Sequence, residues 1–162
     1  MPHGPAAPRM AQTEEVAVYR TLIWSTDGSQ GAEAALMHAR VLAELCDARI
    51  FAVHCDQRLF PGAEVAPRVA SSVYELRDDG FDVELVVRHS RGEAADVVAD
   101  VAAQLHADLI VCGTRGLGAL AGALLGSFTH RLLQVAPCPV LAVQGSATAD
   151  ERVHEWELAV LA

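Results

Sequence analysis

Hydrophobic and polar positions form two kinds of pattern that alternate along the chain. Short apolar runs are separated by longer stretches in which apolar residues recur every three or four positions. The run at 81–88 instead alternates apolar and polar residues, with Val86 as the exception. The short runs predict β-strands, and the longer stretches predict amphipathic helices. The predicted strands are 20–25, 49–55, 81–88, 109–112 and 140–143, and the predicted helices are 30–46, 66–79, 92–106 and 128–136. This alternation predicts a parallel sheet covered by helices on both faces.

Polar residues and glycines suggest where these helices begin and end. Ser90 and Glu93 have the spacing of a capping box, which predicts the start of the third helix. Gly80 suits the C′ position after the second helix. The cluster from Thr26 to Ser29 reads as a turn that caps the first helix, with Asp27 as the candidate N-cap.

Residues suited to ligand binding follow two of the predicted strands. Asp27 follows the first strand, and the glycine turn 113–116 follows the fourth. Ligands of such sheets bind beyond the carboxyl ends of the strands, where the direction of winding reverses. If the first and fourth strands are neighbours, both ends border one crevice. We therefore predict a doubly wound five-stranded parallel sheet with strand order 3-2-1-4-5.

The stretch from Leu109 to Val143 combines a strand, a glycine-rich loop and a helix. Gly113, Gly116 and Gly126 would let backbone N–H groups approach an anion closely. Ser127 would open a helix, whose first turn carries unpaired N–H donors and the positive end of the dipole. The pattern favours a phosphate-binding loop, although these glycines could also serve only as turn residues.

Composition narrows the function classes further. The formal net charge of −9 argues against non-specific binding to nucleic acids or to anionic membranes. All 12 basic residues are arginine, which excludes Walker-type loops, Schiff bases and lysine-dependent kinase chemistry. The four cysteines lack zinc-site spacing, so we expect free thiols in a reducing cytoplasm. We expect neither a secretory signal nor a membrane span.

On the basis of these residues, the chain from about 20 to 144 resembles the universal stress protein family. The specific part is Gly113-x2-Gly116-x9-Gly126-Ser127, the pattern of the ATP-binding members. Asp27 and the ending Ala136–Val140 also match. The resemblance implies a flavodoxin-like three-layer sandwich that binds ATP, with Mg²⁺ or Mn²⁺, at the strand ends. It also implies a homodimer formed through the last strand.

The resemblance further implies a set of site residues. Asp27 and the backbone at Cys55 would meet the adenosine half, and the loop glycines with Arg115 would line the ribose and phosphates. N–H and hydroxyl donors at the start of the last helix would hold phosphate. The implied binding residues are Thr26, Asp27, Cys55, Cys112, Gly113, Arg115, Gly116, Gly126, Ser127, Phe128 and Thr129.

Three functions remain open at this point. The first is a dimeric ATP-binding regulator or sensor, whose role in stress comes from the resemblance alone. The second is a slow ATP hydrolase, for which Asp27 is the available carboxylate near the phosphates. The third is a nucleotide-free scaffold. We expect no catalysis, because no His–Asp relay lies near Ser127 in the sequence. The loop 117–125 carries no charged residue, which suggests modest ATP affinity.

The remaining predictions concern domain organisation. We expect a disordered arm at 1–15 and one domain at 16–145. An extension at 146–162 follows, with Val153, Trp156 and Val160 at helical spacing. In the predicted strand order Cys55 and Cys112 lie on opposite sides of the first strand, about 9–10 Å apart, too far for a disulfide.

Overall fold

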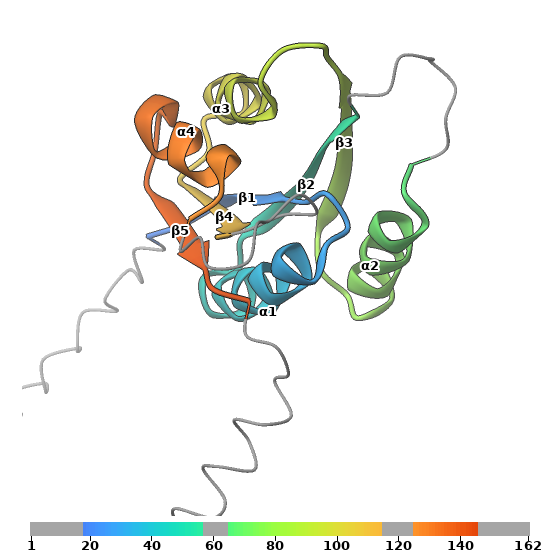
Figure 1. Cartoon of the computed structure of the whole chain (residues 1–162). Helices are drawn as coiled ribbons and strands as arrows, with labels where there is room; N and C mark the ends of the chain where they lie inside the picture. The colour runs from blue at the N-terminus through green and yellow to red at the C-terminus, as the bar shows by residue number, and fades with distance from the viewer. Residues whose placement is uncertain (1–17, 57–64, 115–124, 146–162) are drawn as a thin grey trace, which may run out of the picture.

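A computed structural model describes residues 18–56, 65–114 and 125–145, and these form five strands that alternate with four helices (Figure 1). The strands are β1 (Thr21–Ser25), β2 (Arg49–Asp56), β3 (Val83–His89), β4 (Leu109–Gly113) and β5 (Val140–Val143). The helices are α1 (Gln30–Cys46), α2 (Pro67–Asp78), α3 (Ala94–Gln104) and α4 (Ser127–Val135). The predictions made for 1–15, for 146–162 and for Arg115 and Gly116 fall outside the described residues.

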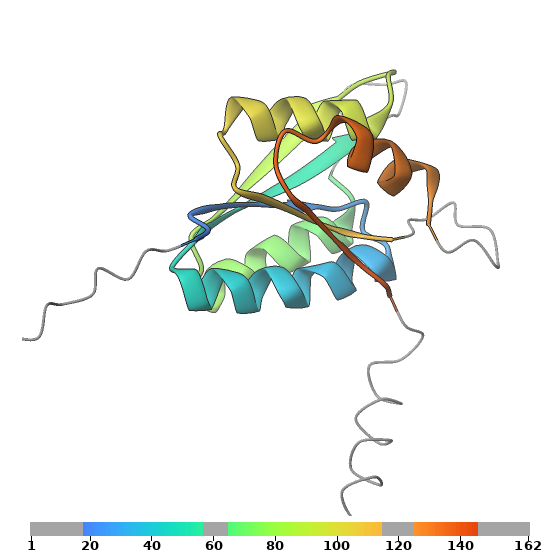
Figure 2. The same ribbon diagram turned by 90° about the vertical axis from the view of Figure 1, so that its left-hand side faces the viewer.

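All neighbouring strands run parallel, and their order in the sheet is β3-β2-β1-β4-β5, as predicted. Figure 2 shows the three layers: α1 and α2 cover one face of the sheet, and α3 and α4 cover the other. The chain therefore winds in one direction from β1 to β3, and then returns to β4 and continues the other way. The reversal falls between β1 and β4, which is where the sequence placed it.

The sheet separates two hydrophobic cores, because successive strand residues point to opposite faces. Leu22 and Trp24 pack with α1 and α2, whereas Ile23 packs with α3 and α4. Trp24 is fully buried, and its indole Nε1–H donates a 2.8 Å hydrogen bond to the carbonyl of Ala32 in α1. Val86, which breaks the alternation along β3, belongs to the second core. β1 is buried on both faces, as a central parallel strand should be.

Two predicted helix caps were wrong, although α1 begins at Gln30 as predicted. The α3 helix begins at Ala94 with Glu93 as its N-cap, and no side chain caps it. Instead, the Ser90 hydroxyl accepts a 3.0 Å hydrogen bond from the N–H of Gly92, so it closes a local turn before the helix. In α1 the N-cap is Ser29, whose hydroxyl accepts from the N–H of Ala32, and not Asp27. Gly80 has φ +89 directly after the C-cap of α2, in agreement with its predicted role.

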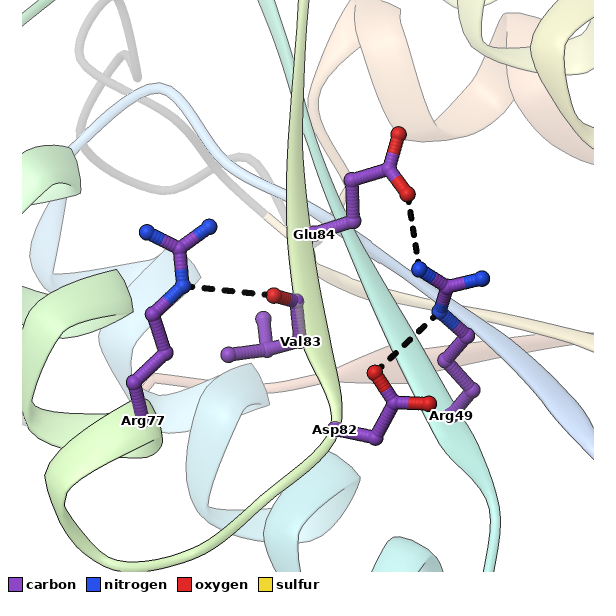
Figure 3. A network of polar contacts seen from close by, with 5 residues as sticks. All are labelled: Arg49, Arg77, Asp82, Val83 and Glu84. Atoms are coloured by element: carbon purple, nitrogen blue, oxygen red, sulfur yellow. Dashed lines mark hydrogen bonds and ion pairs between the residues drawn. The ribbon is translucent and has the colours of Figure 1, made fainter.

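Charged side chains surround the amino-terminal ends of β2 and β3 (Figure 3). Arg49 pairs with Asp82 at 3.3 Å and with Glu84 at 2.8 Å. Its guanidinium lies over the Phe51 ring, 4.7 Å from the centroid. Arg77 donates to the Val83 carbonyl at 3.3 Å. Charges of this kind protect the β3 edge of the sheet from pairing with other chains. They lie at the opposite end of the strands from the candidate site.

Candidate functional site

The candidate site begins where β1 and β4 end side by side. Trp24 pairs with Val111; Trp24 lies two residues before Thr26 in the chain, and Val111 lies two residues before Gly113. Because both strands run in the same direction, the turn after β1 and the loop after β4 leave the sheet at the same edge. The topology thus brings to one edge of the sheet two residues that the sequence singled out, Asp27 and Gly113.

The turn after β1 is held by a dense set of local hydrogen bonds. Thr26 donates its N–H to the Val53 carbonyl at 3.0 Å, and its hydroxyl oxygen accepts from the N–H of Gly28 at 3.2 Å. An Asp27 carboxylate oxygen accepts from the N–H of Ser29 at 3.0 Å. Gly28 has φ +76, which favours glycine. Asp27 is therefore half-buried in a well-defined turn at the carboxyl edge, where it was predicted.

Gly113 has a packing role that the sequence did not reveal. A Cβ at this position would lie 2.6 Å from the carbonyl carbon of Gly31 in the first turn of α1. A Cβ at Gly145 would similarly lie 3.1 Å from the Gly31 Cα. The start of α1 thus lies directly against the ends of β4 and β5. Gly113 is required for this contact whether or not a ligand binds, so its presence is weaker evidence for a phosphate loop than we expected.

The start of α4 offers the strongest binding feature. Gly126 is the N-cap and has no side chain with which to cap the helix. Its own N–H donates to the Thr114 carbonyl at 2.7 Å, which joins the helix start to the end of β4. The first helical bond runs from the N–H of His130 to the Gly126 carbonyl. The N–H groups of Ser127, Phe128 and Thr129 precede it, at the positive end of the helix dipole. These donors can bind an anion.

Several predicted ligand residues near this helix start have side chains that are packed or hydrogen-bonded within the protein. The Thr129 hydroxyl donates to the Gly113 carbonyl at 2.9 Å, and the residue is 1% exposed. This bond anchors α4 to β4 and uses the hydroxyl hydrogen, so a role of this hydroxyl toward phosphate stays a prediction. Cys112 and Phe128 pack in or against the second core. The side chains of Cys112 and Thr129 are buried, whereas Phe128 is half-buried and Ser127 is exposed.

Thr114 is a candidate that the sequence analysis missed. It is 8% exposed, and its hydroxyl oxygen has no hydrogen-bond partner among the described residues. A buried polar group without a partner is uncommon in folded proteins and requires an explanation. The Thr114 backbone joins the end of β4 to the start of α4, because its carbonyl accepts from the N–H of Gly126. The only sequence signal was its position inside the glycine turn.

The cysteines nearest the site are poor nucleophiles. Burial raises the pKa of the half-buried Cys55 thiol, and the negative charge of Asp56 raises it further. Burial raises the pKa of Cys112 to about 11, partly offset by a hydrogen bond with Thr129. Both groups therefore remain thiols at neutral pH, and thiolate chemistry is not favoured. All four cysteines are free.

Two further observations concern metal-binding side chains and membrane-spanning helices. Among residues 18–56, 65–114 and 125–145, no group of three or more His, Cys, Asp or Glu side chains is arranged to hold a metal ion. None of the helices in this part of the chain is long and apolar enough to span a membrane.

A doubly wound sheet with an uncapped helix start at its reversal point defines a class of α/β proteins that bind ligands at the carboxyl edge of the sheet. Within this class, the model of the universal stress protein family matches residues 19–144. The chain therefore belongs to the universal stress protein family, in agreement with the resemblance found in the sequence.

Individual relatives agree with this assignment. A universal stress protein of Methanocaldococcus jannaschii is 31% identical over 148 residues, which cover 78% of this chain and 83% of the relative. One from Thermus aquaticus is 46% identical over a shorter segment of 54 residues, which covers 33% of this chain and 39% of the relative. The longer match shows that the similarity extends across most of the domain.

Solved structures share the fold. A universal stress protein in complex with cAMP aligns with a TM-score of 0.64 and 26% identity, covering 79% of this chain and 98% of that one. A universal stress protein from Archaeoglobus fulgidus in complex with dAMP aligns with a TM-score of 0.58 and 23% identity, covering 77% and 98%. The second likeness supports the fold alone.

Proposed function

We propose that this protein binds an adenine nucleotide, ATP in particular, at the carboxyl edge of its sheet and acts as a nucleotide-dependent regulator or sensor. The observation that carries the proposal is the start of α4, where Gly126 leaves three consecutive N–H donors uncapped next to the ends of β1 and β4. Family membership and the cAMP complex of a structural relative support an adenine nucleotide as the ligand.

The described residues suggest how the nucleotide would be oriented. The N–H groups of Ser127, Phe128 and Thr129 would hold phosphate oxygens, together with the exposed Ser127 hydroxyl. The turn at Asp27 and the backbone at Cys55 lie at the ends of β1 and β2, where the adenosine half would bind. Arg115 and Gly116 would complete the phosphate loop.

A divalent cation, Mg²⁺ or Mn²⁺, would bind mainly to the phosphates. The described part of the chain offers no cluster of metal-binding side chains, which fits a cation carried in by the nucleotide better than a resident metal. When bound, the cation would neutralise phosphate charge. That contribution matters here because the loop 117–125 carries no basic residue.

The site favours binding over catalysis. Asp27 is the carboxylate in the turn after β1, and one of its oxygens already accepts from the Ser29 N–H. The nearby thiols Cys55 and Cys112 have raised pKa values, so neither supplies a nucleophile at neutral pH. We therefore propose a binding protein without enzymatic activity, with slow ATP hydrolysis as the second candidate.

We also propose that the protein forms a homodimer in the cytoplasm and acts in stress responses. The edge strand β5 supports the dimer, because Val140, Leu141 and Ala142 are apolar and half-buried in the single chain. Four free cysteines fit a reducing compartment. The role in stress responses rests on family membership.

The ligand purified with the protein tests the proposed function. The protein would be purified without added nucleotide and then denatured, and the released small molecules would be separated by chromatography. We expect intact ATP or another adenine nucleotide. Accumulation of ADP during incubation with ATP would favour the slow hydrolase. No released nucleotide, together with no heat on titration with ATP and Mg²⁺, would contradict the proposal and favour a nucleotide-free scaffold.

A further inference from the structure

A buried histidine joins the end of β2 to the turn after β1. The His54 ring nitrogen Nδ1 lies 2.9 Å from the carbonyl oxygen of Thr26, and His54 is 7% exposed. A carbonyl oxygen only accepts hydrogen bonds, so Nδ1 carries the hydrogen and donates it. Thr26 is 4% exposed, and the bond therefore satisfies a carbonyl in a buried residue.

This contact completes a full set of restraints on Thr26. The Thr26 N–H donates to the Val53 carbonyl, and its hydroxyl oxygen accepts from Gly28. With His54 on the carbonyl, every polar group of Thr26 has a partner, and two of those partners belong to β2. The turn that presents Asp27 is therefore fixed to β2 as well as to its own strand.

The direction of the next peptide follows from this bond. The Thr26–Asp27 peptide is trans, so the Thr26 carbonyl and the Asp27 N–H point in opposite directions. A carbonyl held by His54 fixes the plane of that peptide, and with it the position of the Asp27 Cα. If the donor is lost, the buried Thr26 carbonyl has to turn toward water or another donor, and the Asp27 side chain moves with it.

We infer that His54 is a positioning residue for nucleotide binding, acting through the Thr26 carbonyl to hold Asp27 at the carboxyl edge of the sheet. The inference rests on the proposed function. His54 itself does not touch the nucleotide in this account, since its Nδ1–H is used by Thr26. Its contribution is to order the binding turn before the ligand arrives, which lowers the cost of binding.

Two substitutions separate the donor from the bulk of the ring. In His54→Asn the side-chain amide nitrogen occupies nearly the place of Nδ1 and can donate to Thr26, whereas His54→Leu keeps the volume without a donor. Titration calorimetry with ATP and Mg²⁺ would measure the affinity of each variant. We expect His54→Leu to bind about tenfold more weakly than the natural protein, and His54→Asn to stay within about threefold.

A stability control and a direct observation complete the test. Val98 of α3 lies in the second core, away from the turn after β1. Val98→Ala should lower the stability of the protein and leave its affinity for ATP unchanged. In the nucleotide-free protein, nitrogen NMR of the His54 ring should find Nδ1 protonated.

An unprotonated Nδ1 would overturn the inference, and so would equal affinity of His54→Leu and the natural protein. If Val98→Ala lost affinity as His54→Leu does, the effect would be one of stability, which would also overturn it. No ATP binding by the natural protein would instead refute the proposed function, and the inference with it.

Discussion

At the scale of single residues, close backbone contacts limit which amino acid a position can hold. The Gly113–Gly31 contact is the clearest, because it allows the first turn of α1 to lie against the end of β4. A glycine that follows a strand is readily interpreted as part of a ligand loop. Here the neighbouring helix already requires it. Binding and packing therefore select for the same residue, and only the tertiary structure separates the two reasons.

Gly113→Ala should destabilise the fold. The added Cβ would lie 2.6 Å from backbone of Gly31, which no side-chain rotation can relieve. We expect a loss of about 1–3 kcal/mol in the free energy of unfolding, measured with urea. Gly92→Ala is the matched control, because its nearest contact would be the Ser90 hydroxyl at 3.4 Å. Equal stability of the two variants would contradict the described contact.

Glu33 gives a prediction that depends on pH. This residue of α1 is half-buried, and the Ser72 hydroxyl lies 3.1 Å from both of its carboxylate oxygens. Burial raises its pKa above 4.5, although the Ser72 hydrogen bond and the Arg68 charge act in the opposite direction. A carboxylate with a raised pKa contributes most to stability below 4.5, where it is protonated. That contribution is lost as the pH rises through the pKa of the folded state.

Glu33→Gln should therefore be more stable than the natural protein at pH 7, by less than about 1 kcal/mol. The advantage should shrink as the pH falls toward 4.5, because the natural side chain then becomes protonated. Thermal unfolding at a series of pH values measures the difference. Glu44→Gln, at an exposed position of the same helix, is the control. An advantage that grows on acidification would show that burial is not the main influence on the Glu33 pKa.

At the scale of elements, the starts of the helices that follow β1 and β4 differ in a way that suits their roles. The α1 helix is capped by the Ser29 hydroxyl. The α4 helix starts at Gly126, which leaves its first N–H groups to other acceptors. A ligand anion would therefore bind preferentially at α4, and α1 would supply the rigid turn beside it. This contrast between the two helix starts is the physical basis for the proposed position of the phosphates.

Gly126→Asp should separate stability from binding. The residue has φ −75 and ψ 160, a conformation open to any amino acid, so a side chain adds no backbone strain. A carboxylate there would cap α4 and raise stability by a few tenths of a kcal/mol. It would also repel phosphate, so ATP affinity should fall at least about tenfold.

Gly126→Asn is the control for charge, because it caps the helix equally well but stays neutral. We expect it to bind ATP more tightly than Gly126→Asp does, with similar stability. Calorimetric titration and urea unfolding would be run on both variants. Undiminished ATP affinity in Gly126→Asp would place the phosphates away from α4.

The ends of elements also show what the sequence could predict. The bounds of α1 and β5 were predicted residue for residue, because strong periodicity and clear flanking turns agree there. The start of α3 was not, since the Ser90 hydroxyl pairs with Gly92 instead of capping a helix. Local side-chain bonds of similar energy compete at such positions, and sequence spacing alone does not decide between them.

At the scale of the whole molecule, the strand order could be predicted from one rule: ligands of such sheets bind beyond the strand ends where the direction of winding reverses. Residues suited to ligand binding follow the first and fourth predicted strands, which implied that these strands are neighbours. In the structure, β1 and β4 are paired. The finer site was less predictable. The burial of the Thr129 hydroxyl and the unpaired Thr114 hydroxyl depend on how α4 packs against β4, which no pattern in the sequence encodes.

The proposed dimer gives a prediction at this scale. The Pro139 and Val143 carbonyls accept hydrogen bonds from β4, so strand alternation directs the polar groups of Val140 and Ala142 to the free edge. Ala142→Pro removes an outward N–H and should prevent pairing of β5 with its copy while keeping the fold. Light scattering should then report 17.2 kDa instead of twice that mass.

Leu141→Pro is the contrasting variant, because the Leu141 N–H points toward β4. We expect it to destabilise the fold itself. A dimer that persists in Ala142→Pro would show that β5 is not the interface.

The central claim is that the main-chain donors at the start of α4 hold the phosphates of an adenine nucleotide beside the turn at Asp27. Amide NMR of the labelled protein titrated with ATP and Mg²⁺ tests it most directly. We predict that the largest shifts fall on Ser127, Phe128 and Thr129, with a second group at Thr26 and Asp27. Saturable binding whose shifts leave both groups unmoved would contradict the account.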